Sequence, residues 1–416
     1  MKKLLSVLIT AALLSSCVLT GCVKSESDSS ESDAADESQT ALVQSSDDDV
    51  VEFVHSENPK VEEPSTCPLS QSEIDLLVSN TNDVIAQYPD FSGTVLLSVG
   101  NQIIYEHSCG NADAKGSTPN ENDTYYQIGS VTKQFTGTAI LMLEKEGKLR
   151  TSDTLDMYFK EYDYDFMKTI TISHLLQMSA GMGDYMQIIE GDQEILDNYL
   201  KAARKSEDDA KKFIVDTIFE EGIYTDPGKV YAYSNSAYYL LGIIIEQLSG
   251  MSYRDYIQQN FFDYADMTDT YFVGDGKDYR TGYSPAQEKY ISDNDDKYLK
   301  AEGDYPYLFS AGSVVSTVED INKWLDIVVS DDIFTSADRQ RVEKSLMCYN
   351  YGWNTAEGSW HHSGRTYAYS SQVYADYNTD TKLVILTNVS FYDYLNEISY
   401  KIFNPMVAAV KKAKKI

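Results

Sequence analysis

The chain has 416 residues, of which 65 are acidic and 34 are Lys or Arg, so its formal net charge at neutral pH is −31. A polyanion of this size is repelled by phosphate backbones, which excludes a generic nucleic-acid-binding protein. Apolar residues make up 42% of the chain, which is enough for a sizeable core and excludes disorder throughout.

The N-terminus has the features of a secretory signal. A short basic start precedes an apolar run at residues 4–19, which is shorter than the about 20 residues of a membrane-spanning helix but suits a signal peptide. The run ends in an LTGC motif that resembles a bacterial lipobox, whose cysteine receives the lipid. We therefore expect residues 1–22 to be a lipoprotein signal peptide with Cys22 as the lipid attachment. Cys17, an ordinary cleaved signal and an uncleaved anchor are the alternatives.

Residues 23–67 form a Ser-, Asp- and Glu-rich stretch that carries 13 acidic residues against two lysines. Such a composition buries too little apolar surface to offset the entropy of ordering, so we expect a disordered acidic tether. No later segment is apolar over a length that spans a membrane. The folded domain is expected at residues 68–416.

The patterns in this domain predict the α/β class. Strand-like runs near both ends, with helices between them, indicate one antiparallel sheet built from the two ends of the domain and flanked by helices, plus a mostly helical region. The expected elements are a helix opened by the Ser70–Glu73 capping box, strands at 91–99 and 103–107, helices over 130–335, strands at 372–377 and 382–387, and a helix at 392–403 before the basic tail 411–415.

Metals and organic cofactors are not expected. Cys67, Cys109 and Cys348 are an odd number without metal-type spacing, which argues against a disulfide scaffold and leaves open whether two of them pair. The adjacent His361 and His362 would point to opposite faces of a strand, so we do not expect a metal site there.

The first chemical motif is the S-x-x-K sequence that runs from Ser130 to Lys133. Apolar residues at helical spacing follow it up to Gly147, which predicts an amphipathic helix with the serine in its first turn. The serine and lysine then share one face, and a desolvated lysine can be neutral and accept the serine proton. The pattern alone also fits an N-cap serine beside a surface lysine.

The second motif is Tyr233-Ser234-Asn235, on a predicted loop that enters a buried helix. A tyrosine there can relay a proton, and the asparagine amide can hold both sides of a substrate amide. The similar Tyr394-Leu395-Asn396 lies inside the predicted last helix, so we treat it as unrelated.

The third motif is His362-Ser363-Gly364, followed by Arg365, on a predicted strand. The glycine allows close approach of the backbone to a ligand, and the next N–H can help to form an oxyanion hole. On its own, a histidine in such a place is also typical of a packed polar residue.

Together and in this order, the three motifs resemble those of the serine penicillin-recognising enzymes, a family of DD-peptidases, class C β-lactamases, esterases and D-amino-acid amidases. The resemblance runs over most of residues 90–405 and includes Ser179-Ala180-Gly181 and Pro227-Gly228. It implies the β-lactamase/transpeptidase-like fold and an enzyme that works through an acyl-enzyme. His174 lies in a family motif that stays outside the chemistry, so we expect a scaffold role for it.

The resemblance also implies roles for the site residues. Ser130 would attack a carbonyl, with Lys133 and Tyr233 as base and proton relay. Asn235 would orient the substrate, the N–H groups of Ser130 and Arg365 would hold the oxyanion, and the His362-Ser363-Gly364 strand would line the site. Class C β-lactamases typically have a lysine where His362 stands, whereas some DD-carboxypeptidases, D-aminopeptidases and esterases have a histidine there. Efficient β-lactam hydrolysis is therefore not expected.

The leading hypothesis is therefore a cell-surface serine hydrolase of D-Ala-type cell-wall peptides, like a DD-carboxypeptidase. An esterase, D-amino-acid amidase or weak β-lactamase with the same mechanism is the alternative, and a non-catalytic penicillin-binding or sensing lipoprotein is a third. The expected partners are a small-molecule or peptide substrate and, through the lipid on Cys22, the outer face of the bacterial cytoplasmic membrane; no nucleic acid is expected.

Overall fold

The computed structural model describes residues 66–112, 118–275, 282–284, 289–291, 307–345, 347–356, 359–366, 368–389 and 392–416. The expected signal peptide, the lipid-attachment residue Cys22 and nearly all of the expected tether lie outside these residues. Within the described ranges, no helix combines the length and the apolar character needed to cross a membrane.

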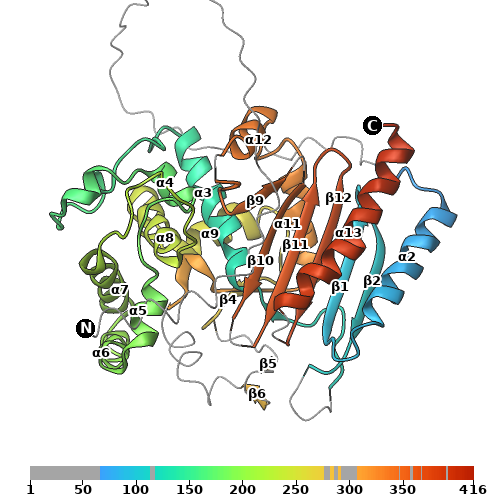
Figure 1. Cartoon of the computed structure of the whole chain (residues 1–416), viewed down its shortest axis with the longest axis horizontal. Helices are drawn as coiled ribbons and strands as arrows, with labels where there is room; N and C mark the ends of the chain where they lie inside the picture. Colours follow the sequence, from blue (N-terminus) through green and yellow to red (C-terminus); the bar gives the residue numbers. More distant parts are fainter. Residues whose placement is uncertain are drawn as a thin grey trace, which may run out of the picture. The chain divides into compact units, whose positions relative to one another are not determined.

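A seven-stranded sheet forms the centre of the described part of the chain (Figure 1). Its order is β2-β1-β12-β11-β10-β9-β8, and every neighbouring pair is antiparallel. Strand β1 pairs with β12, Gly93 lying opposite Thr387, which confirms the expected sheet from both ends of the domain. The strands are β1 (Gly93–Val99), β2 (Gln102–Cys109), β8 (Tyr349–Asn350), β9 (Trp353–Ala356), β10 (Ser359–Arg365), β11 (Ser370–Asp376) and β12 (Thr381–Thr387).

Helices α2 (Gln71–Ile85) and α13 (Tyr392–Lys414) pack against each other, and α13 lies along β11 and β12 (Figure 1). The predicted capping box opens α2, where the Ser70 amide donates to Glu73 Oε2 at 2.9 Å. Side chains from both helices and from the sheet form one apolar core; it includes Leu77, Val84, Val95, Leu97, Ile385, Leu395, Ile398, Ile402 and Met406.

The prediction that the last helix ends near residue 403 is wrong, because α13 continues through Pro405 to Lys414. A proline inside a helix removes the hydrogen bond to the carbonyl four residues earlier. Here that carbonyl, on Lys401, accepts a hydrogen bond from the Asn80 side chain of α2 at 3.3 Å instead. Beyond the proline, Met406 and Val410 are fully buried, so packing on the sheet offsets the cost of the proline.

The opposite side of the sheet meets α11 (Val318–Val329) and the mostly helical region predicted from the sequence. Helices α3 (Lys133–Lys145) and α8 (Asn235–Ser249) pack against each other inside a second, larger core. The other helices are α4 (Ile172–Leu176), α5 (Tyr185–Gly191), α6 (Gln193–Ala203), α7 (Glu207–Glu221), α9 (Tyr253–Ile257) and α12 (Ser336–Glu343), with 3-10 turns η1 (Gly129–Thr132), η2 (Leu155–Met157), η3 (Asp165–Lys168) and η6 (Phe309–Ala311) and the π-helical turn η4 (Gln258–Phe262).

Two small sheets complete the described elements. One has the order β3-β7-β4, with β3 (Tyr126–Gln127), β7 (Val314–Ser316) and β4 (Tyr271–Phe272); the other pairs β5 (Gly282–Ser284) with β6 (Lys289–Ile291). Strand β3 ends one residue before Ile128, whose amide donates to the Val314 carbonyl at 3.0 Å. The first small sheet therefore fixes the backbone that leads into the S-x-x-K motif.

Candidate active site

Ser130 lies in the 3-10 turn η1, directly before helix α3, which agrees with the predicted helical start. Gly129 has a φ of +51°, in the region that favours glycine, and a Cβ on it would lie 2.7 Å from the backbone nitrogen of Arg365. The turn can therefore pack directly against strand β10. Ser130 itself is only partly buried, so its hydroxyl is within reach of a ligand.

Lys133 is completely buried beneath this serine. Its Nζ lies 3.0 Å from Ser130 Oγ, 2.8 Å from Asn235 Oδ1 and 2.6 Å from the Ala311 carbonyl. Burial lowers the pKa of the Lys133 amine to about 7, although the carboxylate of Asp184 acts in the opposite direction. A large fraction of the amine is therefore neutral near pH 7.

The three contacts of Lys133 suit both of its protonation states. The Ala311 carbonyl and Asn235 Oδ1 can only accept hydrogen bonds, so two N–H groups of Lys133 point at them in either state. When the amine is neutral, its lone pair is left for the Ser130 hydroxyl, which then donates. When it is protonated, its third N–H faces the serine oxygen. The amine can therefore take the serine proton without losing a hydrogen bond.

Asp184 orients Asn235 and was not identified from the sequence. Its Oδ2 accepts from the Asn235 backbone amide at 3.0 Å and from Asn235 Nδ2 at 2.9 Å, while its Oδ1 accepts from the Met186 amide at 3.0 Å. Because Nδ2 faces this carboxylate, Oδ1 of Asn235 must face Lys133. Burial raises the pKa of Asp184, whereas the three N–H donors favour its ionised form.

Tyr233 lies in the loop before α8, as predicted, and 36% of its surface is exposed. Its ring centroid is 5.1 Å from Lys133 Nζ, so the structure brings together Ser130, Lys133, Tyr233 and Asn235 from two segments about 100 residues apart. The proton-relay role of Tyr233 stays a prediction, and its placement beside the amine and at the surface is compatible with that role.

His362 lies on strand β10, as predicted, with only 2% of its surface exposed. Its Nδ1 is 2.6 Å from the Ser363 carbonyl, which only accepts, so Nδ1 carries the proton and Nε2 accepts from the Tyr349 hydroxyl at 2.9 Å. Burial, helped by the charge of Lys133, lowers the pKa of His362 to about 3. The imidazole is thus neutral and provides no cation to the site.

Strand β10 is pressed against the turn that holds Ser130. A Cβ on Gly364 would lie 1.9 Å from the Ile128 carbonyl oxygen, so only glycine fits there. The same carbonyl accepts from Ser371 Oγ of the neighbouring strand at 2.7 Å. The backbone of Arg365 follows directly and lies against Gly129. The oxyanion hole between the N–H groups of Ser130 and Arg365 stays a prediction, with which this packing is compatible.

The remaining sequence-based candidates lie outside this cluster. His174 Nδ1 accepts from the Thr171 amide at 3.2 Å at the start of α4, which fits its expected scaffold role. His361 stacks on Tyr374, on the other face of the sheet from His362. No disulfide joins Cys67, Cys109 and Cys348. The described residues contain no group of three or more side chains that could ligate a metal.

Sequence reasoning missed Asp184, Ala311 and Tyr349. Asp184 follows Ser179-Ala180-Gly181 and caps helix α5, so its local signal was only that of an ordinary N-cap. Ala311 acts through its backbone carbonyl, which every residue type has, so the sequence carries no signal for it. Tyr349 is one of 33 tyrosines, and its partner His362 comes 13 residues later on another strand.

Comparison with known proteins agrees with the family that the three motifs resemble. A protein-family model described as Beta-lactamase matches residues 81–400. Penicillin-binding protein 4* of Bacillus subtilis strain 168 is 28% identical over 331 residues, which cover 74% of this chain and 70% of that protein.

Two solved structures share the fold. FmtA from Staphylococcus aureus superposes with a TM-score of 0.65 at 20% identity, covering 82% of this chain and 93% of its own. D-amino acid amidase from Ochrobactrum anthropi SV3, in complex with L-phenylalanine amide, has a TM-score of 0.64 at 20% identity, covering 83% and 99%. The fold class predicted from the sequence is confirmed by these likenesses.

Proposed function

This chain belongs to the beta-lactamase family and is a serine hydrolase of the penicillin-binding-protein type, and we propose that it cleaves D-Ala-type cell-wall peptides as a DD-carboxypeptidase does. The observation that carries the proposal is the contact between Lys133 and Ser130. The amine has a pKa of about 7 and lies 3.0 Å from the serine hydroxyl, so it can act as a general base at neutral pH.

The proposed reaction has two halves. Ser130 Oγ attacks the carbonyl carbon of the scissile amide while Lys133 takes its proton, and the backbone N–H groups of Ser130 and Arg365 stabilise the oxyanion. Tyr233 then passes a proton from Lys133 to the departing amine, which leaves an ester on Ser130. Water attacks this ester, again with loss of a proton to the Lys133–Tyr233 pair, and releases the acid and the free serine.

The charges around the site support a substrate with a terminal carboxylate. His362 is neutral, so the exposed Arg365 beside it is the nearest residue of this strand that can meet an anion with a permanent positive charge. A peptide that ends in D-alanine carries its carboxylate one residue from the scissile bond. Similarity to a penicillin-binding protein supports the same substrate class.

The neutral His362 also favours a second candidate, hydrolysis of an uncharged D-amino-acid amide or ester. Because the strand has no fixed cation at residue 362, a substrate does not need a carboxylate to bind there. The structural likeness to a D-amino acid amidase supports this alternative. A weak β-lactamase would use the same acyl-enzyme.

The test is intact-protein mass spectrometry after incubation with penicillin, combined with turnover assays on a D-Ala–D-Ala peptide, D-phenylalanine amide and an activated ester. We expect a penicillin adduct and release of D-alanine, both absent in Ser130→Ala. Because Ser130 is partly exposed, this variant should keep its thermal stability within about 1 kcal/mol. Turnover of the amide or ester without any release of D-alanine would support the alternative. Turnover retained in Ser130→Ala would exclude the mechanism.

Arg365→Gln separates the two substrate classes. If the guanidinium meets the carboxylate, KM for the peptide should rise about tenfold or more, whereas KM for the uncharged ester should not change. No change in KM for either substrate would show that Arg365 acts only through its backbone.

We further propose that the protein is lipid-anchored through Cys22 on the outer face of the bacterial cytoplasmic membrane. The LTGC motif after an apolar run supports this proposal, and the acidic stretch at 23–67 has the composition of a tether that would hold the domain away from the membrane. Cys22→Ser should abolish incorporation of radiolabelled palmitate in cells, with Cys17→Ser as the matched control. Loss of labelling in the Cys17 variant alone would move the anchor to Cys17.

A further inference from the structure

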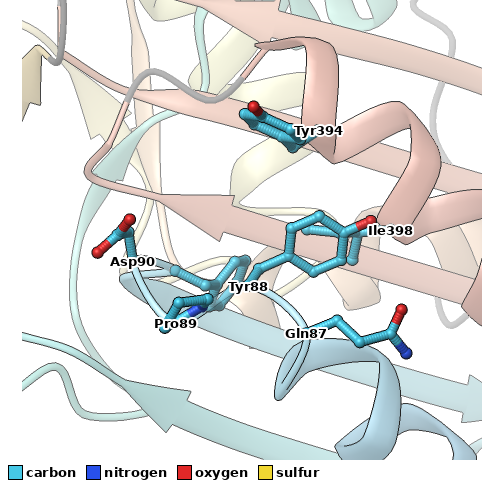
Figure 2. Close-up of a pocket in the computed structure, with 7 residues that line it drawn as sticks. Gln87, Tyr88, Pro89, Asp90, Tyr394 and Ile398 are labelled. Carbon is cyan, nitrogen blue, oxygen red and sulfur yellow. The ribbon is translucent and has the colours of Figure 1, made fainter.

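A small pocket lies outside the catalytic cluster, on the side of the sheet covered by α2 and α13 (Figure 2). It forms where the chain between α2 and β1 passes the first turns of α13, and its volume is about 270 Å³. This size is near the lower limit of small-molecule sites, about 300 Å³, and suits a ligand with a single ring. The lining residues are Gln87, Tyr88, Pro89, Asp90, Phe91, Tyr394 and Ile398.

Two tyrosine rings form the walls of this pocket. The ring centroids of Tyr88 and Tyr394 are 5.9 Å apart with an interplanar angle of 57°, and 54% of Tyr394 is exposed. Phe91 and Ile398, which also line the pocket, are buried and form its apolar floor. An exposed aromatic ring over an apolar floor offers a flat surface to the apolar face of a ligand.

The rim of the pocket is polar and carries both signs of charge. Gln87 and Asp90 are exposed at its edge. Lys401 Nζ contacts the Tyr88 hydroxyl at 3.3 Å and Gln87 Oε1 at 3.2 Å, and it pairs with Glu397 at 2.7 Å. Gln87 Nε2 also donates to the Asp83 carbonyl at 3.0 Å, so the pocket offers the second N–H of this amide and the Asp90 carboxylate, next to a cation that is already paired.

These charges oppose an anionic ligand and leave the Tyr88 ring occupied for a cationic one. Lys401 Nζ lies 5.5 Å from the centre of the Tyr88 ring, so a cationic ligand would meet a cation already held by that ring. An anionic ligand would meet Asp90 and the net charge of −31. The aromatic wall, the apolar floor and the polar rim together suit a neutral ligand with one apolar face and several hydroxyl groups.

We propose that this pocket binds a pyranose ring of a neutral saccharide. One face of the sugar stacks on Tyr394, and its hydroxyls donate to the Asp90 carboxylate and exchange hydrogen bonds with the Gln87 amide. The site would hold a glycan while the catalytic residues, on the other side of the sheet, act elsewhere on the same polymer. The shared polymer rests on the proposed function, whereas saccharide binding itself does not, since no catalytic residue lines the pocket.

The test is titration of the purified full-length protein with chitotetraose and with maltotetraose, followed by saturation-transfer NMR and calorimetry. The matched pair of variants is Tyr394→Ala and Tyr400→Ala: both tyrosines are on α13 and are similarly exposed, at 54% and 51%, but Tyr400 does not line the pocket. We expect millimolar or tighter binding of at least one saccharide, weakened at least tenfold by Tyr394→Ala and unchanged by Tyr400→Ala.

Asp90→Asn provides a second variant that keeps the size of the side chain, and it should weaken binding about threefold to tenfold. Hydrolysis of a small soluble substrate should be the same in all three variants, so loss of saccharide binding and loss of catalysis are measured separately. Absence of binding by the unmodified protein, or equal binding by the Tyr394 and Tyr400 variants, would overturn the proposal.

Discussion

Asp184→Asn tests how the site sets the basicity of Lys133. The carboxylate of Asp184 is held by both N–H groups of Asn235, whose carbonyl oxygen in turn contacts the lysine amine. The negative charge therefore acts on Lys133 across a single amide group and raises its pKa against the effect of burial. Asparagine removes this charge and nearly preserves the shape of the side chain.

The expected effect on Lys133 follows from the charge. For unit charges separated by one amide group, an effective dielectric constant of about 20 gives an interaction of about 2 kcal/mol, which corresponds to roughly 1.5 pH units. Without the carboxylate, the pKa of Lys133 should fall from about 7 by this amount. Since the neutral amine is the active form, the acidic limb of the rate profile should move to lower pH.

A second effect should accompany the first. Asparagine offers only one oxygen in place of two and cannot accept both hydrogen bonds from Asn235 as the carboxylate does. Loss of one such bond costs about 1–1.5 kcal/mol, so the plateau of kcat/KM should fall about tenfold.

The assay is the pH profile of kcat/KM, which reports the ionisations of the free enzyme. Asp192→Asn is the matched control, because Asp192 caps the next helix, α6, by accepting from the Glu194 amide at 2.8 Å and is exposed. Asparagine caps helices as well as aspartate does, so this variant should change neither the limb nor the plateau. A limb that stays in place or moves to higher pH in Asp184→Asn would refute the reasoning.

Three further results are expected. Gly364→Ala should destabilise the fold by about 3 kcal/mol and abolish acylation, because its Cβ would overlap the Ile128 carbonyl. Denaturant unfolding and adduct assays measure the two effects. The control is Gly191→Ala, where a Cβ meets nothing within 4 Å, and it should change neither stability nor acylation. Tyr349→Phe should cost about 1–3 kcal/mol in urea unfolding, since it leaves Nε2 of the buried His362 without its donor; an unchanged midpoint would contradict this bond. In ¹⁵N-histidine NMR, the His362 ring should stay neutral and protonated on Nδ1 from about pH 8 down to about pH 5, because its pKa is about 3; titration within that range would refute its burial.

The local elements could be predicted from the sequence because their signals are local. The capping box at Ser70, the hairpin around Gly100 and the strands on either side of residues 378–381 depend on residues a few positions apart, and all are present. The order of the three motifs likewise predicted the family and the fold. The end of α13 was missed because Pro405 is a local stop signal that packing across the sheet overrides.

The sequence by itself determined which residue types are available for catalysis and on which kinds of element they lie. Only the tertiary structure decided their chemistry. Lys133 has a pKa of about 7 because it is buried against the Ala311 carbonyl, 178 residues away, and Asp184 orients Asn235 from a different helix. Burial and contacts between distant segments set the pKa values, which no short motif determines.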